Sequence, residues 1–290
     1  MTRAISTVAD VTLFLLLVGA AAAAVVHGAG LTPPSTGSPA AGDAELLTTN
    51  TASVEYSLNI SGEPPLWITN ATVRHRRTAH GTLAELLGEA AMSNVTVDGA
   101  RLATSGTGFE SAVTNTTRQR LRDPGRRHAV RVRWEPYRGA PVNGTVRVGS
   151  RPPPSADVHA TTTAIPSPVA SARVSATAGA IEHGYEGVAT AVAEAVVAGL
   201  FPPEQAQLAL DGGYPSNRLM ATRYQRMAAL TGADELAVDN TSAATMNGNL
   251  TTALAETFEA DMRNRFDSPE AAADSVRTGR ITITVRTWSP

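Results

Sequence analysis

Six histidines and a few neighbouring carboxylates are the side chains of this 290-residue sequence with the right chemistry for metal binding or acid–base catalysis. A zinc-protease helix needs two histidines four residues apart with a glutamate between them, whereas His75 and His80 are five apart. The carboxylates of Asp234–Glu235 and of Glu259 and Asp261 fall on predicted solvated helix faces. The histidines are His27, His75, His80, His128, His159 and His183. We expect none of these residues to be catalytic or to bind a metal.

The sequence lacks the motifs of the common catalytic classes. It contains no G-x-S-x-G elbow, no G-x-x-x-x-G-K-[ST] loop and no G-x-G-x-x-G after a predicted strand. It has no cysteine, which excludes disulfides and thiolate metal sites. All 24 basic residues are arginine, so a phosphate-loop lysine and a Schiff-base lysine are excluded too. We therefore expect a non-enzymatic protein without a cofactor.

The arginines are concentrated in one segment. Residues 74–151 carry fourteen arginines against six acidic residues, whereas residues 152–290 carry nine arginines against fifteen acidic residues. Such a basic segment is typical of a docking surface for an acidic partner or an anionic polymer. The alternative is a set of solvated arginines that pair with acidic residues elsewhere in the same fold. The segment has no interleaved aromatic platform, so we expect no nucleic-acid binding.

Asparagine usage indicates a compartment outside the cytoplasm. Seven of the eleven asparagines begin an N-x-S/T sequon, and none of the seven has proline in the middle position. This excess predicts a chain exposed to N-glycosylation, although threonine-rich loops also produce sequons by chance. The candidate acceptors are Asn59, Asn70, Asn94, Asn115, Asn143, Asn240 and Asn249.

An apolar stretch near the N-terminus has the length of one membrane-spanning helix. Positions 11–26 contain no charged residue, and an extension back to Ile5 adds only Asp10. A helix needs about 20 residues to cross the hydrocarbon core. Arg3 precedes the stretch and no arginine follows it until Arg74, so the positive-inside rule places the N-terminus in the cytoplasm. We expect a single-pass protein of the cell membrane with an extracellular C-terminal domain.

Periodicity predicts the elements of that domain. Apolar and polar residues alternate as in strands at Val54–Ile60, Ala129–Trp134, Gly144–Val148, Asp157–Ile165, Arg280–Trp288 and, more weakly, Leu66–His75. Helical spacing occurs at Thr82–Met92, Phe109–Leu121, Pro203–Leu210, Asn217–Leu230 and Ala243–Phe266, and in an apolar stripe formed by Val188, Val192 and Val196. In the strands at 129–134 and 144–148, arginines alternate with apolar residues, as in a sheet with one face exposed to water.

Four regions follow from these elements. Residues 1–27 form a signal-like start and a transmembrane helix, and residues 28–44 have the Gly/Pro/Ser/Thr composition of a flexible linker. Residues 45–168 mix strands and helices, and residues 169–290 form a helical region that ends in a strand. Because that last strand should return to the earlier sheet, we expect the two regions to form one α+β unit with an antiparallel sheet and a helical block.

The residues Arg3-Ala4-Ile5-Ser6, followed by the apolar span, resemble the class III signal of archaeal type IV pilins and pilin-like proteins. The resemblance implies cleavage by a prepilin peptidase after Ala4, so that Ile5 becomes the new N-terminus and the retained helix packs in a filament core. Bacterial pilins carry glutamate at the fifth mature position. Here that position is Ala9 and the carboxylate is Asp10, one place later. A carboxylate in a membrane segment is costly unless paired, so Asp10 either neutralises a neighbouring α-amino group or lies in the headgroup layer.

A second resemblance extends over about half of the chain. The start R-A-I-S-T-V-x-D-V and the segment His80–Ala91 (HGTLAELLGEAA) are similar to those of uncharacterised haloarchaeal proteins encoded near type II/IV secretion-type ATPases. Together the two resemblances imply a minor pilin-like component of an archaeal pilus or secretion-type assembly. Its partners would be the membrane, a prepilin peptidase, other pilin-like subunits and an assembly platform.

A different class of function stays open. The small-residue run Ala20–Ala24 is also typical of signal-peptidase cleavage. The protein would then be a secreted or membrane-tethered cell-surface binding protein, or an unrecognised hydrolase, because catalytic triads are assembled in space rather than in sequence.

Overall fold

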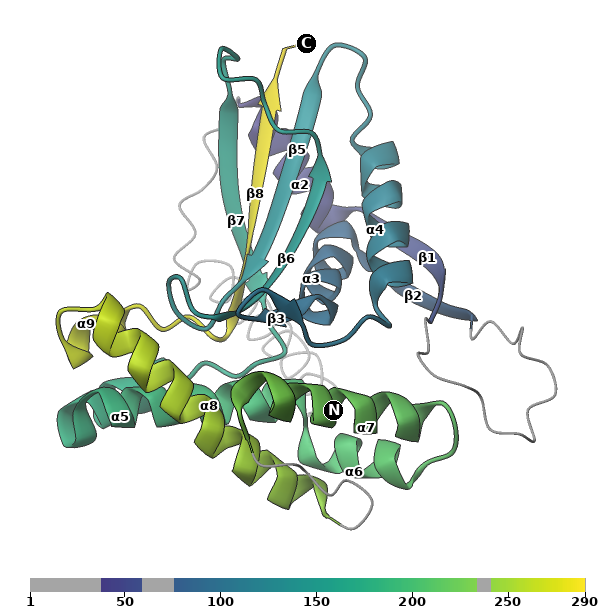
Figure 1. Cartoon of the computed structure of the whole chain (residues 1–290). Coiled ribbons are helices and arrows are strands. Elements are labelled where there is room, and N and C mark those ends of the chain that lie inside the picture. The colour runs from purple at the N-terminus through teal and green to yellow at the C-terminus, as the bar shows by residue number, and fades with distance from the viewer. Residues whose placement is uncertain (1–37, 59–75, 234–240, 290) are drawn as a thin grey trace, which may run out of the picture. The chain divides into compact units, whose positions relative to one another are not determined.

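Six strands form an antiparallel sheet at the centre of the part of the chain that the computed structural model describes, residues 38–58, 76–233 and 241–289 (Figure 1). The order across the sheet is β4-β3-β6-β5-β8-β7, so the C-terminal strand lies inside it. The strands are β3 (Val95–Val97), β4 (Ala100–Arg101), β5 (Arg127–Trp134), β6 (Val142–Gly149), β7 (His159–Pro166) and β8 (Arg280–Trp288). The return of β8 to pair with both β5 and β7 confirms the predicted α+β fold with an antiparallel sheet.

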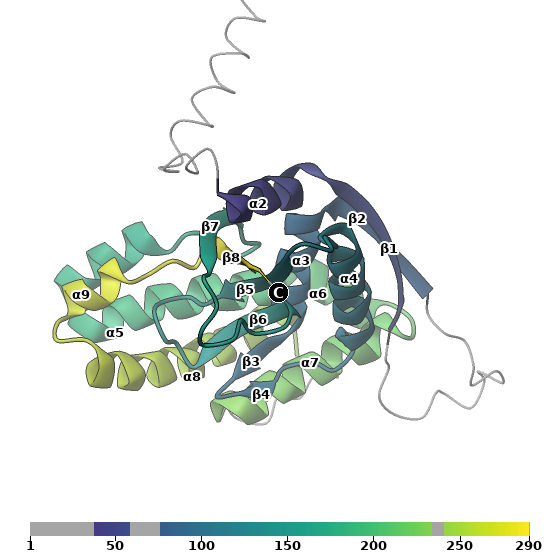
Figure 2. The ribbon, with the colours of Figure 1, turned by 90° about the horizontal axis from the view of Figure 1, so that it is seen from above.

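One face of the sheet is covered by helices α2 (Pro39–Thr49), α3 (Leu83–Ser93) and α4 (Thr107–Arg120). Figure 2 shows all three on the same side, with the two-stranded sheet of β1 (Thr51–Ser57) and β2 (Arg76–Thr82) beside them. The helix α3 begins with a capping box in which the Thr82 hydroxyl accepts from the Glu85 backbone N–H and the Glu85 carboxylate accepts from the Thr82 N–H.

The two faces of the sheet differ because side chains alternate along each strand. Val130, Val132 and Trp134 of β5 are buried under the helices, whereas Arg131 and Arg133 between them lie on the opposite face. The same alternation in β6 and β8 gives the sheet one apolar face and one polar face, as an antiparallel sheet allows. The open face is turned towards the viewer in Figure 1.

A helical block follows β7 in the chain. It consists of α5 (Arg173–Leu200), α6 (Pro203–Asp211), α7 (Ser216–Thr231), α8 (Ala243–Arg265) and α9 (Pro269–Asp274). The helix α8 lies along α5, and its residues Leu250, Leu254, Phe258 and Met262 are fully buried, as their four-residue spacing predicts.

The helix α5 is bent into two halves. Gly184 interrupts it with φ of 63° and ψ of −137°, a conformation that residues with a Cβ rarely adopt. The halves cross at Gly179 and Gly187, whose backbones touch: a Cβ added at Gly187 would lie 2.3 Å from the Gly179 carbonyl oxygen. Only a pair of glycines permits this crossing.

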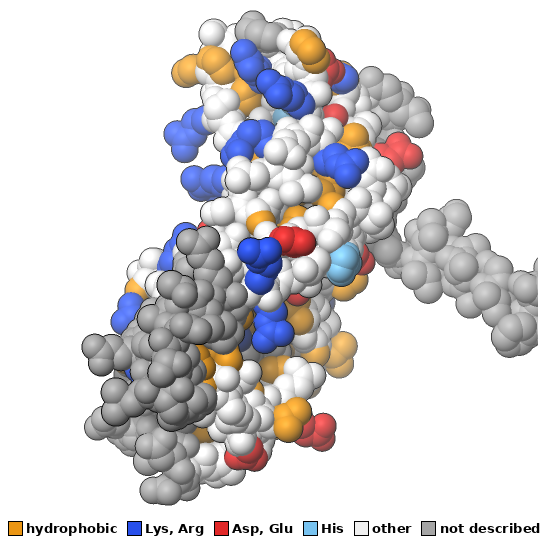
Figure 3. Space-filling view, turned by 90° about the vertical axis from the view of Figure 1, so that its right-hand side faces the viewer, with side chains coloured by type: hydrophobic (Ala, Val, Ile, Leu, Met, Phe, Trp, Pro, Cys, Tyr) orange, Lys and Arg blue, Asp and Glu red, His pale blue; other side chains and the backbone are white. Residues whose placement is uncertain are grey.

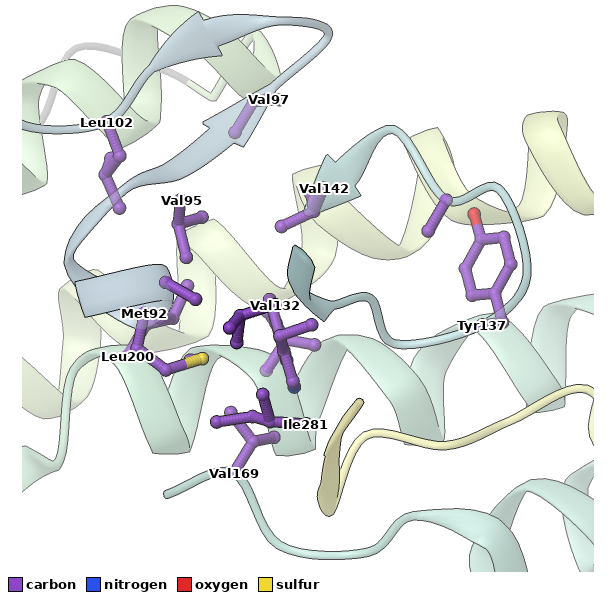
Figure 4. Close-up of a cluster of buried hydrophobic side chains, with 14 of the residues drawn as sticks. Met92, Val95, Val97, Leu102, Val132, Tyr137, Val142, Val169, Leu200 and Ile281 are labelled. Carbon is purple, nitrogen blue, oxygen red and sulfur yellow. The ribbon is translucent and has the colours of Figure 1, made fainter. Parts of the chain in front are cut away.

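Thr278, which is fully buried in the segment before β8, joins the sheet to the helical block. Its carbonyl accepts from Trp134 Nε1 at 2.8 Å and from Ser167 Oγ at 2.7 Å. Its hydroxyl donates to the Ala170 carbonyl at 2.6 Å and accepts from the Ala172 N–H at 2.9 Å, just before α5. Apolar side chains meet at the same junction: Figure 4 shows Val132 and Ile281 of the sheet near Val169 and Leu200.

Several predicted elements are confirmed with small changes in their ends, namely α3, α4, β5, β6, β7, α6, α7, α8 and β8. The predicted linker 28–44 is wrong over its last residues, because α2 begins at Pro39 and buries Ala40, Ala41 and Ala44. The weaker strand prediction at Leu66–His75 lies outside the described residues.

The predicted transmembrane helix also lies outside the described residues. Within residues 38–58, 76–233 and 241–289, no single helix is long and apolar enough to cross a membrane. The helices α5 and α6 taken together are long and apolar enough, but a bend of 41° separates them.

Candidate functional site

Five arginines project from the open face of the sheet, and we call this surface the arginine face. Its members are Arg131 and Arg133 of β5, Arg147 of β6, and Arg280 and Arg286 of β8. Arg131 lies directly opposite Arg147 in the ladder between β5 and β6. Like charges directly opposite each other destabilise a sheet, so this pair does not contribute to folding.

A single carboxylate balances one end of the arginine face. Glu135, which is buried at the end of β5, forms ion pairs with Arg133 and with Arg277 of the segment before β8. The Nε of Arg133 donates to Glu135 Oε2 at 2.8 Å, and the Gly139 N–H donates to the same oxygen at 3.1 Å. Because its oxygens already have these partners, Glu135 acts as a structural clamp and not as a free acid.

The other four arginines lack such a partner. Among the described residues, Arg131, Arg147, Arg280 and Arg286 form no ion pair with an acidic residue. The prediction of solvated arginines in the basic segment is confirmed for Arg131 and Arg147, which are exposed. The predicted pairing with acidic residues of the same fold occurs for Arg101, Arg126 and Arg133 of that segment, but not for Arg131 and Arg147 among the described residues.

The closeness of these positive charges affects the pKa values of the guanidinium groups on the arginine face. Partial burial lowers the pKa of the Arg131 guanidinium, and the positive charges of Arg133, Arg147 and Arg286 lower it further. Burial, with Arg133 and Arg280 nearby, lowers the pKa of Arg277 in the same way. Arginine stays protonated at neutral pH despite such shifts, so the face keeps its positive charge and favours a bound anion.

Two hollows lie on the arginine face. One of about 360 Å³ is bordered by Arg131, Arg147 and Arg286, and one of about 140 Å³ is bordered by Arg131, Arg133 and Glu135. Figure 3, which views the molecule from the side of α4, shows arginine side chains gathered on its upper part. No aromatic ring lines either hollow, so bases of a nucleic acid would find no stacking platform there.

The chemistry of this surface is recognition of anions. Each guanidinium offers a planar fork of donors that fits a carboxylate or a phosphate in a bidentate arrangement. Thr282 and Thr284 lie between Arg280 and Arg286 on the same face of β8 and add short hydroxyl donors. A flat surface of this kind fits an acidic protein surface better than it fits a small buried substrate.

Sequence reasoning found only part of this surface. The basic segment 74–151 contains Arg131, Arg133 and Arg147, but Arg280 and Arg286 come from the acidic C-terminal region. The signal for them was the alternation R-I-T-I-T-V-R at positions 280–286, which matches the alternation in β5. The arginines of β8 and those of β5 form one surface only because Arg286 pairs with Ala129, next to Arg131, in the register between these two strands.

The other residues predicted to have a role are scattered. Arg3, Ala4, Ile5 and Asp10 lie outside the described residues. Of the histidines, His128 binds Asp43 of α2 through Nδ1 at 2.7 Å, and this pair is largely buried. Glu259 and Asp261, which the sequence places on a solvated helix face and for which no catalytic role is expected, bind Arg263 and Arg265 of the same helix. No group of three or more histidine or acidic side chains within the described residues is placed to hold a metal.

The sequons fall in different environments. Asn115 and Asn249 are exposed on helices, and Asn143 is half-buried on β6. Asn94 is buried, its Oδ1 accepts from Arg101, and its Nδ2, the atom that would carry a glycan, is enclosed. The folded chain therefore does not present Asn94 as an acceptor. Asn59, Asn70 and Asn240 lie outside the described residues.

The fold and the site define an α+β protein whose open sheet face carries unpaired arginines. The chain belongs to the family of unknown function DUF7284, whose model matches residues 9–288. No curated protein and no solved structure shows significant similarity to the chain.

Proposed function

We propose that this protein is a membrane-anchored, extracytoplasmic and non-enzymatic subunit of the pilin-like type, a minor component of an archaeal type IV pilus or secretion-type assembly. In this proposal its arginine face binds an acidic surface of a neighbouring subunit. The observation that carries the proposal is the group of four arginines, Arg131, Arg147, Arg280 and Arg286, which have no acidic partner among the described residues.

These four arginines do not stabilise the isolated fold. They face away from the apolar core, and two of them stand directly opposite each other in the sheet. Repulsion between these arginines weakens the isolated sheet. A partner with an acidic surface would supply the opposite charge and would account for their presence. Charge complementarity of this kind also accelerates and orients association.

The N-terminal sequence supports the assembly part of the proposal. The residues Arg3 and Ala4 before the apolar span have the types that a prepilin peptidase recognises, and the orientation rule places the domain outside the cytoplasm. A retained helix would both anchor the subunit and pack against the helices of other subunits, and Asp10 would neutralise a neighbouring α-amino group there.

Reversing charge on the arginine face is expected to abolish assembly without unfolding the domain. The double variant Arg131→Glu with Arg147→Glu removes two cations and adds two anions where the acidic partner would bind. We expect the amount of subunit in the sheared cell-surface fraction, relative to total membranes, to fall by at least about tenfold, since buried charge pairs contribute about 2 kcal/mol or more each at an interface.

A matched control variant shows whether the change in net charge alone affects assembly. Arg76 and Arg218 are exposed and lie outside the arginine face, so Arg76→Glu with Arg218→Glu changes the net charge equally. This control should assemble normally, and both variants should unfold at or above the wild-type urea midpoint. Equal incorporation of the arginine-face variant and wild type would refute the docking role.

The mature N-terminus tests the pilin-like part separately. We expect mass spectrometry of the protein from native membranes to find Ile5 as the first residue. A start beyond about residue 22 would remove the assembly helix and favour the alternative of a secreted surface-binding protein or hydrolase, for which Ala20–Ala24 offers a signal-peptidase site. An intact Met1 would favour a plain membrane anchor.

A further inference from the structure

A third hollow, also lined by arginines, lies on the helix-covered side of the sheet. It has a volume of about 530 Å³ and opens between the end of α4, the segment 121–126 and the neighbouring ends of β5 and β6. Four arginines line it, Arg118, Arg122, Arg126 and Arg127, against a single acidic side chain, Asp123. Its volume is in the range of sites for small molecules.

Two of these arginines are held in place by neighbours. The Arg126 Nε donates to Asp123 Oδ2 at 2.8 Å, and the other oxygen of Asp123 accepts from the Gly125 N–H at 2.8 Å. Arg118 donates to the Asn115 Oδ1 at 2.7 Å. Arg122 and Arg127 form no ion pair with an acidic residue in the described part of the chain. The hollow thus combines preorganised cations with cations that have no counter-charge.

The floor of the hollow is not basic. Leu121, Val130 and Val148 form it, and their side chains belong to the core. His128 also lines the hollow: its Nδ1 is bound to Asp43, while its Nε2 is enclosed and has no hydrogen-bond partner. A ligand here would meet guanidinium groups at the rim and aliphatic side chains below, so it needs an anionic part and a body that tolerates an apolar surface.

We propose that this hollow binds a small molecule that carries a diphosphate group. Two adjacent tetrahedral oxyanions can accept from several guanidinium forks at once, which a single carboxylate cannot do. The volume of about 530 Å³ leaves room for the body of the ligand. Its four arginines are different residues from those of the arginine face, although this hollow adjoins the hollow of about 360 Å³ there and shares Val130, Val148, Gly149 and Ser150 with it.

Isothermal titration of the full-length chain in a non-ionic detergent tests the proposal, with inorganic pyrophosphate and inorganic phosphate as probes. We expect pyrophosphate to bind at least about tenfold more tightly than phosphate. The variant Arg118→Gln with Arg122→Gln should weaken pyrophosphate binding by at least about tenfold, because two charge-assisted donors are lost. The variants Arg76→Gln with Arg218→Gln, and Arg131→Gln with Arg147→Gln, should change it less than about twofold, since none of these residues lines the hollow and their charges are screened by salt.

Each other outcome overturns the assignment. No binding of pyrophosphate by the wild type removes the site, and an equal loss in all three variants shows only general charge attraction. A loss confined to the Arg131 and Arg147 variant places the anion on the arginine face instead. A second pair of probes, ADP and geranyl diphosphate, then distinguishes a nucleotide from a lipid-like body, since the body that fits the apolar floor will bind more tightly than pyrophosphate alone.

Discussion

Substitution of Gly187 by alanine is expected to lower the free energy of unfolding by about 3 kcal/mol or more, because overpacking against backbone cannot be relieved by a rotamer change. A Cβ at this position would lie 2.3 Å from the Gly179 carbonyl oxygen and 2.6 Å from its carbonyl carbon. The two halves of α5 would have to separate, and the contacts of α5 with α8 and α9 would separate with them.

Urea unfolding followed by circular dichroism measures the effect, with Gly248→Ala as the control. Gly248 lies within α8 and a Cβ there meets nothing within 4 Å, so alanine should stabilise the helix by about 0.5 to 1 kcal/mol through its better propensity. The same chemical change should therefore have opposite signs at the two positions. A Gly187→Ala variant as stable as wild type would show that the crossing of the α5 halves is not tight.

Replacement of Thr278 by valine is expected to cost about 1 to 3 kcal/mol, since it leaves the buried Ala172 N–H without a partner and removes the hydrogen bond to the carbonyl of the exposed Ala170. Valine has nearly the shape of threonine, so packing should be preserved. The hydroxyl, however, is the partner of both the Ala172 N–H and the Ala170 carbonyl. These groups lie where the chain enters α5, so the helical block loses one of its polar contacts with the sheet region.

The control for this prediction is Thr284→Val on the open face of β8. Its hydroxyl contacts only the exposed hydroxyl of Thr162, at 3.3 Å, so the change should stay within about 0.5 kcal/mol of wild type. Amide hydrogen exchange should also show faster exchange at the start of α5 in the Thr278 variant. Similar midpoints for both threonine variants would mean that the Thr278 hydroxyl has no structural importance.

Local sequence patterns predicted most of the elements because each pattern has its own period. Leu250, Leu254 and Phe258 repeat every four residues, and Val130 and Val132 alternate with arginines, so α8 and β5 follow from spacing alone. The element β2, with the sequence RRTAHGT, has no apolar alternation and was missed, since its pairing with β1 decides its conformation.

The bend in α5 and the arginine face needed three-dimensional information. Gly184 lies in a segment with ordinary helical composition. The local sequence does not predict that Gly179 and Gly187 are in contact across the bend. The arginine face joins residues 131 and 147 to residue 286, which are brought together only by the pairing of β5 with β6 and β8. The first part of α2, residues 39–44, falls in the predicted linker because its alanines, glycine and proline are also typical of flexible segments.

The place of β8 in the sheet sets the order in which the domain can be completed. Val132 pairs with Ile283 on one side of β8, and Thr163 pairs with Ile283 on the other, so β7 is joined to the described sheet through β8. Because β8 follows the whole helical block in the sequence, a chain made from its N-terminus carries β5 and β7 with exposed edges until β8 has been synthesised. Completion of this sheet therefore depends on long-range pairing, and a chain that ends before Arg280 leaves two strand edges open to other molecules.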